Sequence, residues 1–376
     1  MKDIMGLIYT GENDAGLREL TQVRAVAALP VAGRYRVIDF PVSSMVNTGI
    51  RNVGVITQKN YHSLMDHLGS GKEWDLHGKN NGLVILPPFL TRENVGVYTG
   101  LVDALQSNDN YLHRSRQEYI ILATSHEIFN TDFNDMVRFH IEREADITLL
   151  YTDEPAMRRV TQGSESSFCT TDESGRIVGL EIDPTTPTRE HAIIEVCLLK
   201  RELLRHLVDQ AAANGQHEFM REVLQPAIND GSLHVYGYEH KGRTWRIESV
   251  QDYFQLNMDL LDSRVRGELF SRRYPVYTKL RDDMPTRYVG EAAVTNSLVA
   301  DGCVIEGTVV NSVLFRGVRI AKGAVVRNSV VMQDAVVEPD AELDYCILDK
   351  QAVIRRKGRL IGPPAYPILI AKGIVI

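Results

Sequence analysis

The sequence predicts an α/β domain built on a doubly wound, mostly parallel sheet, followed by a coil of short parallel strands. Through the first two-thirds of the 376 residues, short apolar runs alternate with longer amphipathic segments, which is typical of strands joined by crossover helices. From about Glu291 an aliphatic residue recurs every five or six positions instead. Residues 264–290 contain two prolines and many charges, as linkers with some helix do. We therefore expect an α/β domain (1–263), a linker and a coil domain (291–376).

The strands of the α/β domain are predicted where β-branched and aliphatic residues cluster. The candidates are Met5–Tyr9, Val53–Thr57, Tyr119–Ala123, Ile147–Tyr151 and His234–Tyr238. Helical spacing of apolar residues is clearest in Thr131–Arg143 and Val250–Ser263.

The coil is predicted from its repeat. The recurring residues are Leu298, Val304, Val309, Leu314, Ile320, Val326, Val331, Val337, Leu343, Leu348 and Ile354. A six-residue period is one side of a triangular parallel coil, in which each aliphatic side chain points inward and stacks on the one a full turn away. A run of short antiparallel strands is the alternative, but hairpins would give a period of two.

Composition limits the function classes. Hydrophobic residues make up 44% of the chain and charged residues 24%, as in ordinary globular proteins. A formal charge of -7 argues against a nucleic-acid partner, because such proteins concentrate basic residues. The four cysteines have no CxxC spacing, the histidines have no metal-ligand spacing, and no stretch approaches the ~20 apolar residues of a membrane span. We predict a cytoplasmic protein without a membrane or nucleic-acid partner.

Five strings carry a family resemblance: residues 33–41 (GRYRVIDFP), 53–58 (VGVITQ), 69–75 (GSGKEWD), 296–307 (NSLVADGCVIEG) and 366–373 (YPILIAKG). With them, the chain resembles glucose-1-phosphate adenylyltransferase, also called ADP-glucose pyrophosphorylase, over nearly its whole length. The resemblance implies a nucleotidyltransferase domain followed by a left-handed parallel β-helix of hexapeptide repeats. It also implies a reaction in which ATP and glucose 1-phosphate give ADP-glucose and pyrophosphate, with Mg²⁺ and cationic side chains neutralising the phosphates.

The phosphate-binding positions of the family are altered. Its loop AGGxGxRL matches residues 10–17 (TGENDAGL), where Glu12 and Asp14 replace glycines and Gly16 replaces the arginine. Carboxylates in this loop would repel a triphosphate. Val26 replaces a phosphate-binding lysine. An alternative stays open in which the loop moves and another cation substitutes.

The metal and sugar positions are altered as well. Ser125 and Ile247 stand at the two metal-binding aspartates, and neither supplies the charge that Mg²⁺ needs. Glu127 lies close enough in sequence to leave the first assignment ambiguous. In the sugar-phosphate pocket, Asp183 replaces a lysine, and Glu195 ends a segment that replaces Ser-Met-Gly. The resemblance therefore implies no catalytic residue, metal or cofactor for this chain alone, with Mg²⁺ and ATP used by a catalytic partner.

Other family positions are kept as candidate ligand or effector residues: Gln58, Tyr98, Gly100, Asp103, Arg24 and Arg36. Gly100 and Asp103 match the family's GTADA segment, and Tyr98 matches a tyrosine on the sugar side, although shaping a loop and capping a helix would explain these residues at least as well. Gln58 matches a loop residue used in signalling between effector and active site. Arg24 and Arg36 match positions near an anionic effector site.

Three functions follow from these observations. The leading hypothesis is a regulatory, non-catalytic subunit that assembles with a homologous catalytic subunit, as a heterotetramer, in glycogen biosynthesis, with a small-molecule effector. The second is an active enzyme with relocated cations, and the third an acyltransferase acting at the coil. The third lacks the histidine that this chemistry uses, because no histidine occurs in Glu291–Ile376. Under the leading hypothesis, returning family residues to positions 16, 26, 125 and 247 should recover some turnover.

Overall fold

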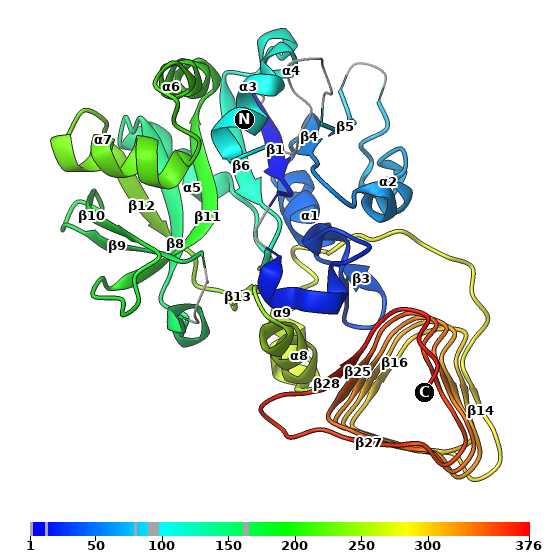
Figure 1. Cartoon of the computed structure of the whole chain (residues 1–376). Helices are drawn as coiled ribbons and strands as arrows, with labels where there is room; N and C mark the ends of the chain where they lie inside the picture. Colours follow the sequence, from blue (N-terminus) through cyan, green and yellow to red (C-terminus); the bar gives the residue numbers. More distant parts are fainter. Residues whose placement is uncertain (1–2, 12–13, 79–80, 89–97, 161–164) are drawn as a thin grey trace.

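A computed structural model describes residues 3–11, 14–78, 81–88, 98–160 and 165–376 of the chain. A triangular coil lies against one end of an α/β domain, next to helix α8 (Val250–Asp259) (Figure 1). The two predicted architectures are therefore present.

Within the described residues, nine strands form the main sheet of the α/β domain. They are β1 (Ile4–Tyr9), β4 (Val53–Ile56), β5 (Leu83–Leu86), β6 (Tyr119–Thr124), β8 (Ile147–Thr152), β9 (Ser167–Thr171), β10 (Ile177–Ile182), β11 (His191–Lys200) and β12 (Val235–Glu239). The five predicted strands are confirmed to within one residue at each end. Strands β5, β4, β1 and β6 run parallel, as do β8 and β12, whereas β11 runs antiparallel between β6 and β8. The sheet is thus mixed, with a parallel half that positions the site described below.

Helices cover both faces of this sheet. The α-helices of the described residues are α1 (Asp39–Asn47), α2 (His62–Leu68), α3 (Leu101–Ser107), α4 (Asp109–Arg114), α5 (Asn134–Glu142), α6 (Arg201–Ala213), α7 (Gln225–Asp230), α8 and α9 (Ser263–Leu269). Of these, α8 and α9 pack near the coil and away from the sheet. Shorter turns are η1 (Ala15–Leu20), η2 (Val26–Ala28), η3 (Lys72–Trp74), η4 (Pro155–Arg158) and the π-helical η5 (Phe219–Leu224). Among the described residues, no helix has the length and apolar character to cross a membrane.

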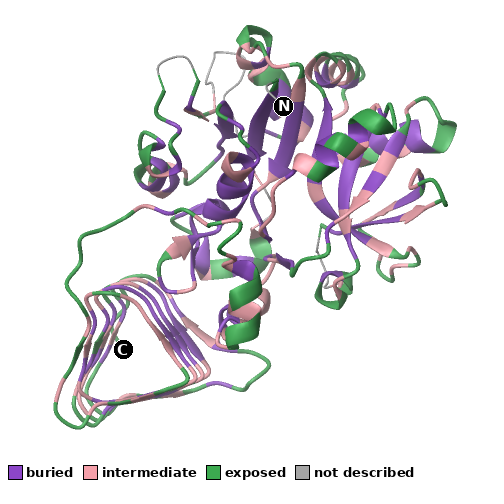
Figure 2. Ribbon diagram, turned by 180° about the vertical axis from the view of Figure 1, so that it is seen from behind, coloured by how far each residue is buried: buried purple, intermediate pink, exposed green. Residues whose placement is uncertain are grey.

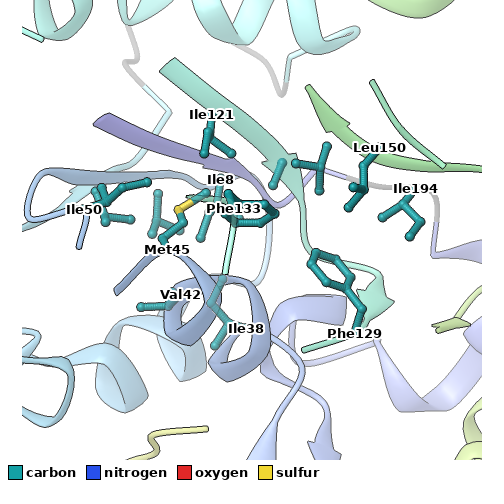
Figure 3. Packing of buried hydrophobic residues seen from close by; sticks show 14 of the residues in the cluster. Ile8, Ile38, Val42, Met45, Ile50, Ile121, Phe129, Phe133, Leu150 and Ile194 are labelled. Carbon is teal, nitrogen blue, oxygen red and sulfur yellow. The ribbon is translucent and has the colours of Figure 1, made fainter. Parts of the chain in front are cut away.

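The core confirms the doubly wound arrangement. On one face, Met45 of α1 and Phe133, just before α5, pack against Ile8 and Ile121 of the sheet (Figure 3). On the other face, α3, α6 and α7 cover a second apolar cluster. The predicted helix at 131–143 is α5. The one predicted at 250–263 is α8, which ends four residues earlier, and α9 begins at Ser263, where the Asp262 side chain accepts the Arg264 N–H.

Two small antiparallel pairs complete the α/β domain. Strand β2 (Pro30–Val31) pairs with β3 (Tyr35–Arg36), and β7 (Glu127–Ile128) pairs with β13 (Trp245–Arg246). The second pair brings the two predicted metal positions close together.

The coil consists of three parallel sheets, each with five short strands in the described range 165–376. The strands are β14 (Arg287–Tyr288), β15 (Ala293–Thr295), β16 (Leu298–Val299), β17 (Val304–Ile305), β18 (Thr308–Val310), β19 (Val313–Leu314), β20 (Arg319–Ile320), β21 (Val325–Arg327), β22 (Val330–Val331), β23 (Val336–Val337), β24 (Glu342–Asp344), β25 (Cys346–Leu348), β26 (Val353–Ile354), β27 (Arg359–Ile361) and β28 (Ile368–Ile370). The sheets form the sides of a triangle, as in a left-handed β-helix of hexapeptide repeats (Figure 1). The first strand, β14, lies within the segment assigned to the linker.

Inward stacking follows the predicted repeat with one correction. Ile305, Ile320, Val337 and Ile354 are aligned one turn apart and fully buried. Leu298 and Val304, which were predicted to point inward, are only half-buried, because their neighbours Val299 and Ile305 take the inward positions. Two adjacent aliphatic residues made the register ambiguous in the sequence.

The two domains share an apolar cluster. Leu17 and Phe254 of the α/β domain pack with Phe315, Met332 and Ile347 on the outer side of one coil sheet. Figure 2 shows this side of the coil as buried. Because fully buried side chains cross the boundary, the domains form one packed unit.

Candidate functional site

An open cleft lies at the carboxyl ends of β1, β4 and β6, the edge at which open α/β sheets bind ligands. Tyr9 ends β1, Gln58 follows β4 and Thr124 ends β6, and all three line the cleft. Asp183, after β10, and Arg221, in η5, line it as well. This cleft corresponds to the place where the resemblance puts the nucleotide and the sugar phosphate.

The cleft is acidic. Its described lining includes the carboxylates of Asp14, Glu165, Asp183, Glu195 and Glu218. The two cations of this lining are already paired: Lys59 Nζ lies 2.9 Å from Asp14 Oδ1, and Arg221 Nη2 lies 2.5 Å from Asp183 Oδ2. Burial, and then the charge of Glu222, raises the pKa of Glu218. A polyphosphate entering this cleft would meet net negative charge.

The segment that matches the phosphate loop is packed against the neighbouring chain. A Cβ atom added at Gly16 would lie 2.2 Å from the carbonyl oxygen of Glu248, so backbone occupies the space that a side chain would need. Leu17 and Leu20 are fully buried in the shared apolar cluster, and Val26 lies in the same cluster. The family's arginine and lysine positions are therefore filled by packing as well as changed in type.

The described cations near this segment do not replace the missing ones. Arg18 Nη1 donates to the Tyr366 hydroxyl on the coil at 2.9 Å, and its side chain does not line the cleft. Lys59 is held by Asp14. The alternative of a substituting cation therefore has no support from these two side chains. Glu12 lies outside the described residues.

The two predicted metal positions are close together and fully buried. The Ile247 N–H donates to the carbonyl of His126 at 2.9 Å, which brings Ile247 next to the segment that holds Ser125. Ile247 packs in the shared apolar cluster, and Ser125 is also without exposure. Burial, and then the charge of Arg246, lowers the pKa of His126 to about 3, so its imidazole is neutral. None of these groups offers an anionic ligand.

Glu127, the alternative candidate for the first metal position, binds other groups of the protein. Its Oε1 accepts from Arg246 Nε at 3.0 Å and Nη2 at 2.8 Å, and its Oε2 accepts the Glu195 N–H at 2.7 Å. Arg246 also donates to Ser166 Oγ and the Ile193 carbonyl. Burial acts to lower the pKa of Arg246, but the neighbouring carboxylates, Glu127 first, outweigh burial and raise it. A fixed buried cation thus neutralises Glu127.

Mg²⁺ does not fit the residues at these positions. Within the described parts of the chain, no group of three or more His, Cys, Asp or Glu side chains is arranged to hold a metal ion. The nearby Glu248 accepts the Glu165 N–H at 2.9 Å, and burial raises its pKa to about 7. A carboxyl group whose ionisation is disfavoured by burial is a poor ligand for a hard divalent cation.

The kept positions Gln58 and Tyr98 join the walls of the cleft. Gln58 Nε2 donates to the Tyr9 hydroxyl at 2.6 Å and to the Tyr98 carbonyl at 3.3 Å. Both side chains are buried and line the cleft. Gln58 thus connects the ends of β1 and β4 to the chain that enters α3.

Gly100 and Asp103 shape the same entry. A Cβ atom at Gly100 would lie 2.4 Å from the His217 carbonyl oxygen. Asp103 Oδ2 accepts the Thr99 N–H at 3.1 Å, and Oδ1 lies 2.8 Å from His217 Nδ1, which raises the pKa of His217. Both Asp103 oxygens are therefore used for helix capping and for holding the adjacent chain.

A second site lies between the two domains. The charged lining of this small basic pocket consists of Arg34, Arg36, His67, Lys279, Arg281, Arg316 and Lys350. None of its described lining residues is Asp or Glu. Cations converging from both domains make it suited to an anion.

The two predicted effector arginines have different environments. Arg36 lines the basic pocket and donates to the Ser63 carbonyl and hydroxyl, at 2.9 and 2.8 Å. Burial lowers the pKa of Arg36 to about 10. Arg24 does not line the pocket, because its Nη2 lies 2.9 Å from Asp349 Oδ1 in a buried ion pair between the domains.

Arg316 was not predicted from the sequence, yet it is the clearest sign of a ligand in the basic pocket. Its side chain is 11% exposed, and its Nε and Nη2 have no hydrogen-bond partner among the described residues. Its nearest carboxylate, Asp283, is 3.6 Å away. Buried guanidinium groups normally use their donors, and Arg316 lines the basic pocket, so an anion bound there would supply the missing acceptor.

Family comparisons cover both domains. The family described as "Nucleotidyl transferase" matches residues 6–263. The family described as "GlmU-like, C-terminal hexapeptide" matches residues 284–364.

Similar proteins carry two kinds of name. The glycogen biosynthesis protein GlgD of Bacillus subtilis (strain 168) is 33% identical over 377 residues, covering 99% of this chain and 96% of that protein. A glucose-1-phosphate adenylyltransferase of Bacillus mycoides (strain KBAB4) is 31% identical over 375 residues, covering 98% of each. Another, from Geobacillus stearothermophilus, is 33% identical over 329 residues, covering 87% of this chain and 84% of that enzyme. Because the identities are nearly equal, they do not show whether the chain is functionally closer to GlgD or to the adenylyltransferases. The residues of the site have to decide this.

Proposed function

The chain belongs to the glucose-1-phosphate adenylyltransferase family of nucleotidyltransferases, and from this premise we propose that it is a regulatory subunit with little or no activity of its own. It assembles with a homologous catalytic subunit, as a cytoplasmic heterotetramer, and modulates the synthesis of ADP-glucose for glycogen.

The observation that carries the proposal is the packing at the two predicted metal positions. Ile247 is buried among apolar side chains, and Glu127 is neutralised by Arg246. Phosphoryl transfer in this family depends on a metal and cations at the phosphates, so their loss removes the main source of transition-state stabilisation. A chance substitution at one position would leave the space at the other predicted positions free. Here, buried side chains and backbone occupy several of these positions.

The regulatory part of the proposal is supported by the basic pocket. An anionic effector bound there would contact Arg36 of the α/β domain and Arg316 and Lys350 of the coil at once. A bound subunit can change its partner's activity only if its contacts differ between the partner's states. A ligand that fixes the two domains against each other supplies such a difference.

The test is a pyrophosphate-release assay of this chain alone and mixed with the catalytic homologue from the same genome, with Mg²⁺, ATP and glucose 1-phosphate. We expect no measurable turnover from the chain alone, co-purification of the two chains, and a changed activity or effector response of the mixture. Turnover by the chain alone at roughly 1–100 per second would instead establish an active enzyme with relocated groups. Failure to co-purify, with an unchanged mixture, would contradict the regulatory role.

Anion binding gives a separate prediction. Arg316→Met should weaken binding of sulfate to the full chain by roughly tenfold to a hundredfold, because a charge-assisted hydrogen bond is lost. Isothermal titration calorimetry measures the change. Arg319→Met, an exposed arginine in the same turn of the coil, is the matched control and should leave binding unchanged. Equal effects of the two variants would show that sulfate does not use the basic pocket.

A further inference from the structure

We propose that anion binding in the basic pocket is coupled to the uptake of one proton by the Lys350 amine, so that the site responds to pH as well as to the anion. This inference rests on one part of the proposed function, namely that an anion binds in the basic pocket.

Lys350 has no carboxylate of its own. The adjacent Asp349 accepts the backbone N–H of Lys350 at 2.6 Å, but its Oδ1 is also bound to Arg24 Nη2 at 2.9 Å. The Asp349 charge is therefore balanced by Arg24. Among the described residues, no Asp or Glu forms an ion pair with the Lys350 amine.

The charged groups around Lys350 come from every neighbouring element. They are Arg24 before η2, Arg34 and Arg36 in and next to β3, His67 in α2, Lys279 and Arg281 in the linker, Arg316 in the coil, Asp349 beside Lys350, and Lys372 after β28. Four of these cations lie near a carboxylate: Arg24 lies 2.9 Å from Asp349, Lys279 lies 3.4 Å from Asp66, and His67 lies 2.5 Å from Asp39, whereas Arg316 lies 3.6 Å from Asp283 without a hydrogen bond. The surroundings of the amine are thus mainly cationic.

These surroundings make the amine titrate near neutrality. Burial, and then the charges of Arg36 and Arg24, lowers the pKa of Lys350 to about 7. In the empty pocket the amine is therefore largely neutral above this pH. A dianion in the pocket favours the protonated amine and raises its pKa, so binding draws in a proton.

The sign of the pH dependence follows from this linkage. Binding is strongest where Lys350 is already protonated, below about pH 7. Above that pH, affinity falls by up to about tenfold per unit until the pKa of the complex is reached. Between about pH 7 and about pH 8.5, we expect the dissociation constant to rise roughly tenfold.

The experiment uses the full chain and inorganic sulfate, which keeps both charges throughout this range. Titration calorimetry in buffers with different ionisation enthalpies reports the protons taken up with each sulfate. We expect close to one proton at about pH 8.5 in the unchanged protein. Lys350→Arg should bind sulfate with the same affinity at both pH values, and Lys350→Met should bind weakly at both, with no proton uptake in either variant.

Lys279→Met is the matched control, because it removes another lysine of the same pocket. It should weaken sulfate binding and keep the proton uptake. Uptake that persists in both Lys350 variants would assign the proton to another group and overturn the inference. If the unchanged protein binds sulfate without taking up a proton, the inference is wrong but the proposed function stands. If it binds no sulfate at any pH, the effector part of the proposed function is wrong as well.

Discussion

Ile247→Asp should strongly destabilise the chain instead of restoring a metal ligand. Ile247 is fully buried and packs between α8 and the segment that matches the phosphate loop. An aspartate there would bring an uncompensated charge into an apolar cluster shared by both domains. We expect a loss of roughly 4 kcal/mol or more in the free energy of unfolding, a large part of the total stability of a typical protein. Urea denaturation followed by circular dichroism measures it.

Two controls separate burial from the change of residue type. Ile247→Val, which only shortens the side chain, should cost about 1 kcal/mol. Ile361→Asp makes the same substitution at a coil residue that is 53% exposed, and should cost about 1 kcal/mol or less. If Ile247→Asp were no more destabilising than Ile361→Asp, the packing argument for a closed metal site would be wrong.

The same packing changes one expectation from the sequence. Family residues were expected to recover some turnover when returned to positions 16, 26, 125 and 247. An arginine at Gly16 would place its Cβ 2.2 Å from a backbone oxygen, and a lysine at Val26 would be buried in the apolar cluster. These substitutions would disrupt the domain contact before they could form a site. We now expect no recovery without rebuilding this segment.

Local sequence patterns were sufficient for the parts of the fold that depend on local periodicity. The parallel strands β1, β4 and β6 and the helix α5 were predicted because each has a continuous apolar run or a single apolar face. Strand β11 was missed, since its antiparallel place between β6 and β8 is decided by pairing with distant strands.

The candidate sites also have features that the sequence predicted and features that only the packing shows. Altered residue types at Gly16, Ser125 and Ile247 were visible by comparison with the family pattern, but the backbone and side chains that fill the space were not. The basic pocket joins Arg34 and Lys350, which are more than 300 residues apart in the chain. Arg316 and Lys350 have no local motif, so their role became apparent only when the domains were packed together.

Removal of Arg24 should be the other strongly destabilising change. The Arg24–Asp349 pair is 2.9 Å long, and its side chains are 2% and 0% exposed. Arg24→Met leaves the Asp349 charge buried without its partner, at a cost of roughly 3–5 kcal/mol. Urea denaturation should show the loss, whereas Arg51→Met, which breaks an exposed pair with Asp75, should change stability by less than about 1 kcal/mol.

A double substitution tests whether the lost stability comes from the unpaired charge. Adding Asp349→Leu to Arg24→Met removes the second charge, so the double variant should be more stable than Arg24→Met alone, with a coupling energy of at least about 2 kcal/mol. Additive losses from the two single variants would mean that each side chain acts through packing alone. Because the pair joins the α/β domain to the coil beside Lys350, a large coupling would identify it as the charged contact that holds the basic pocket together.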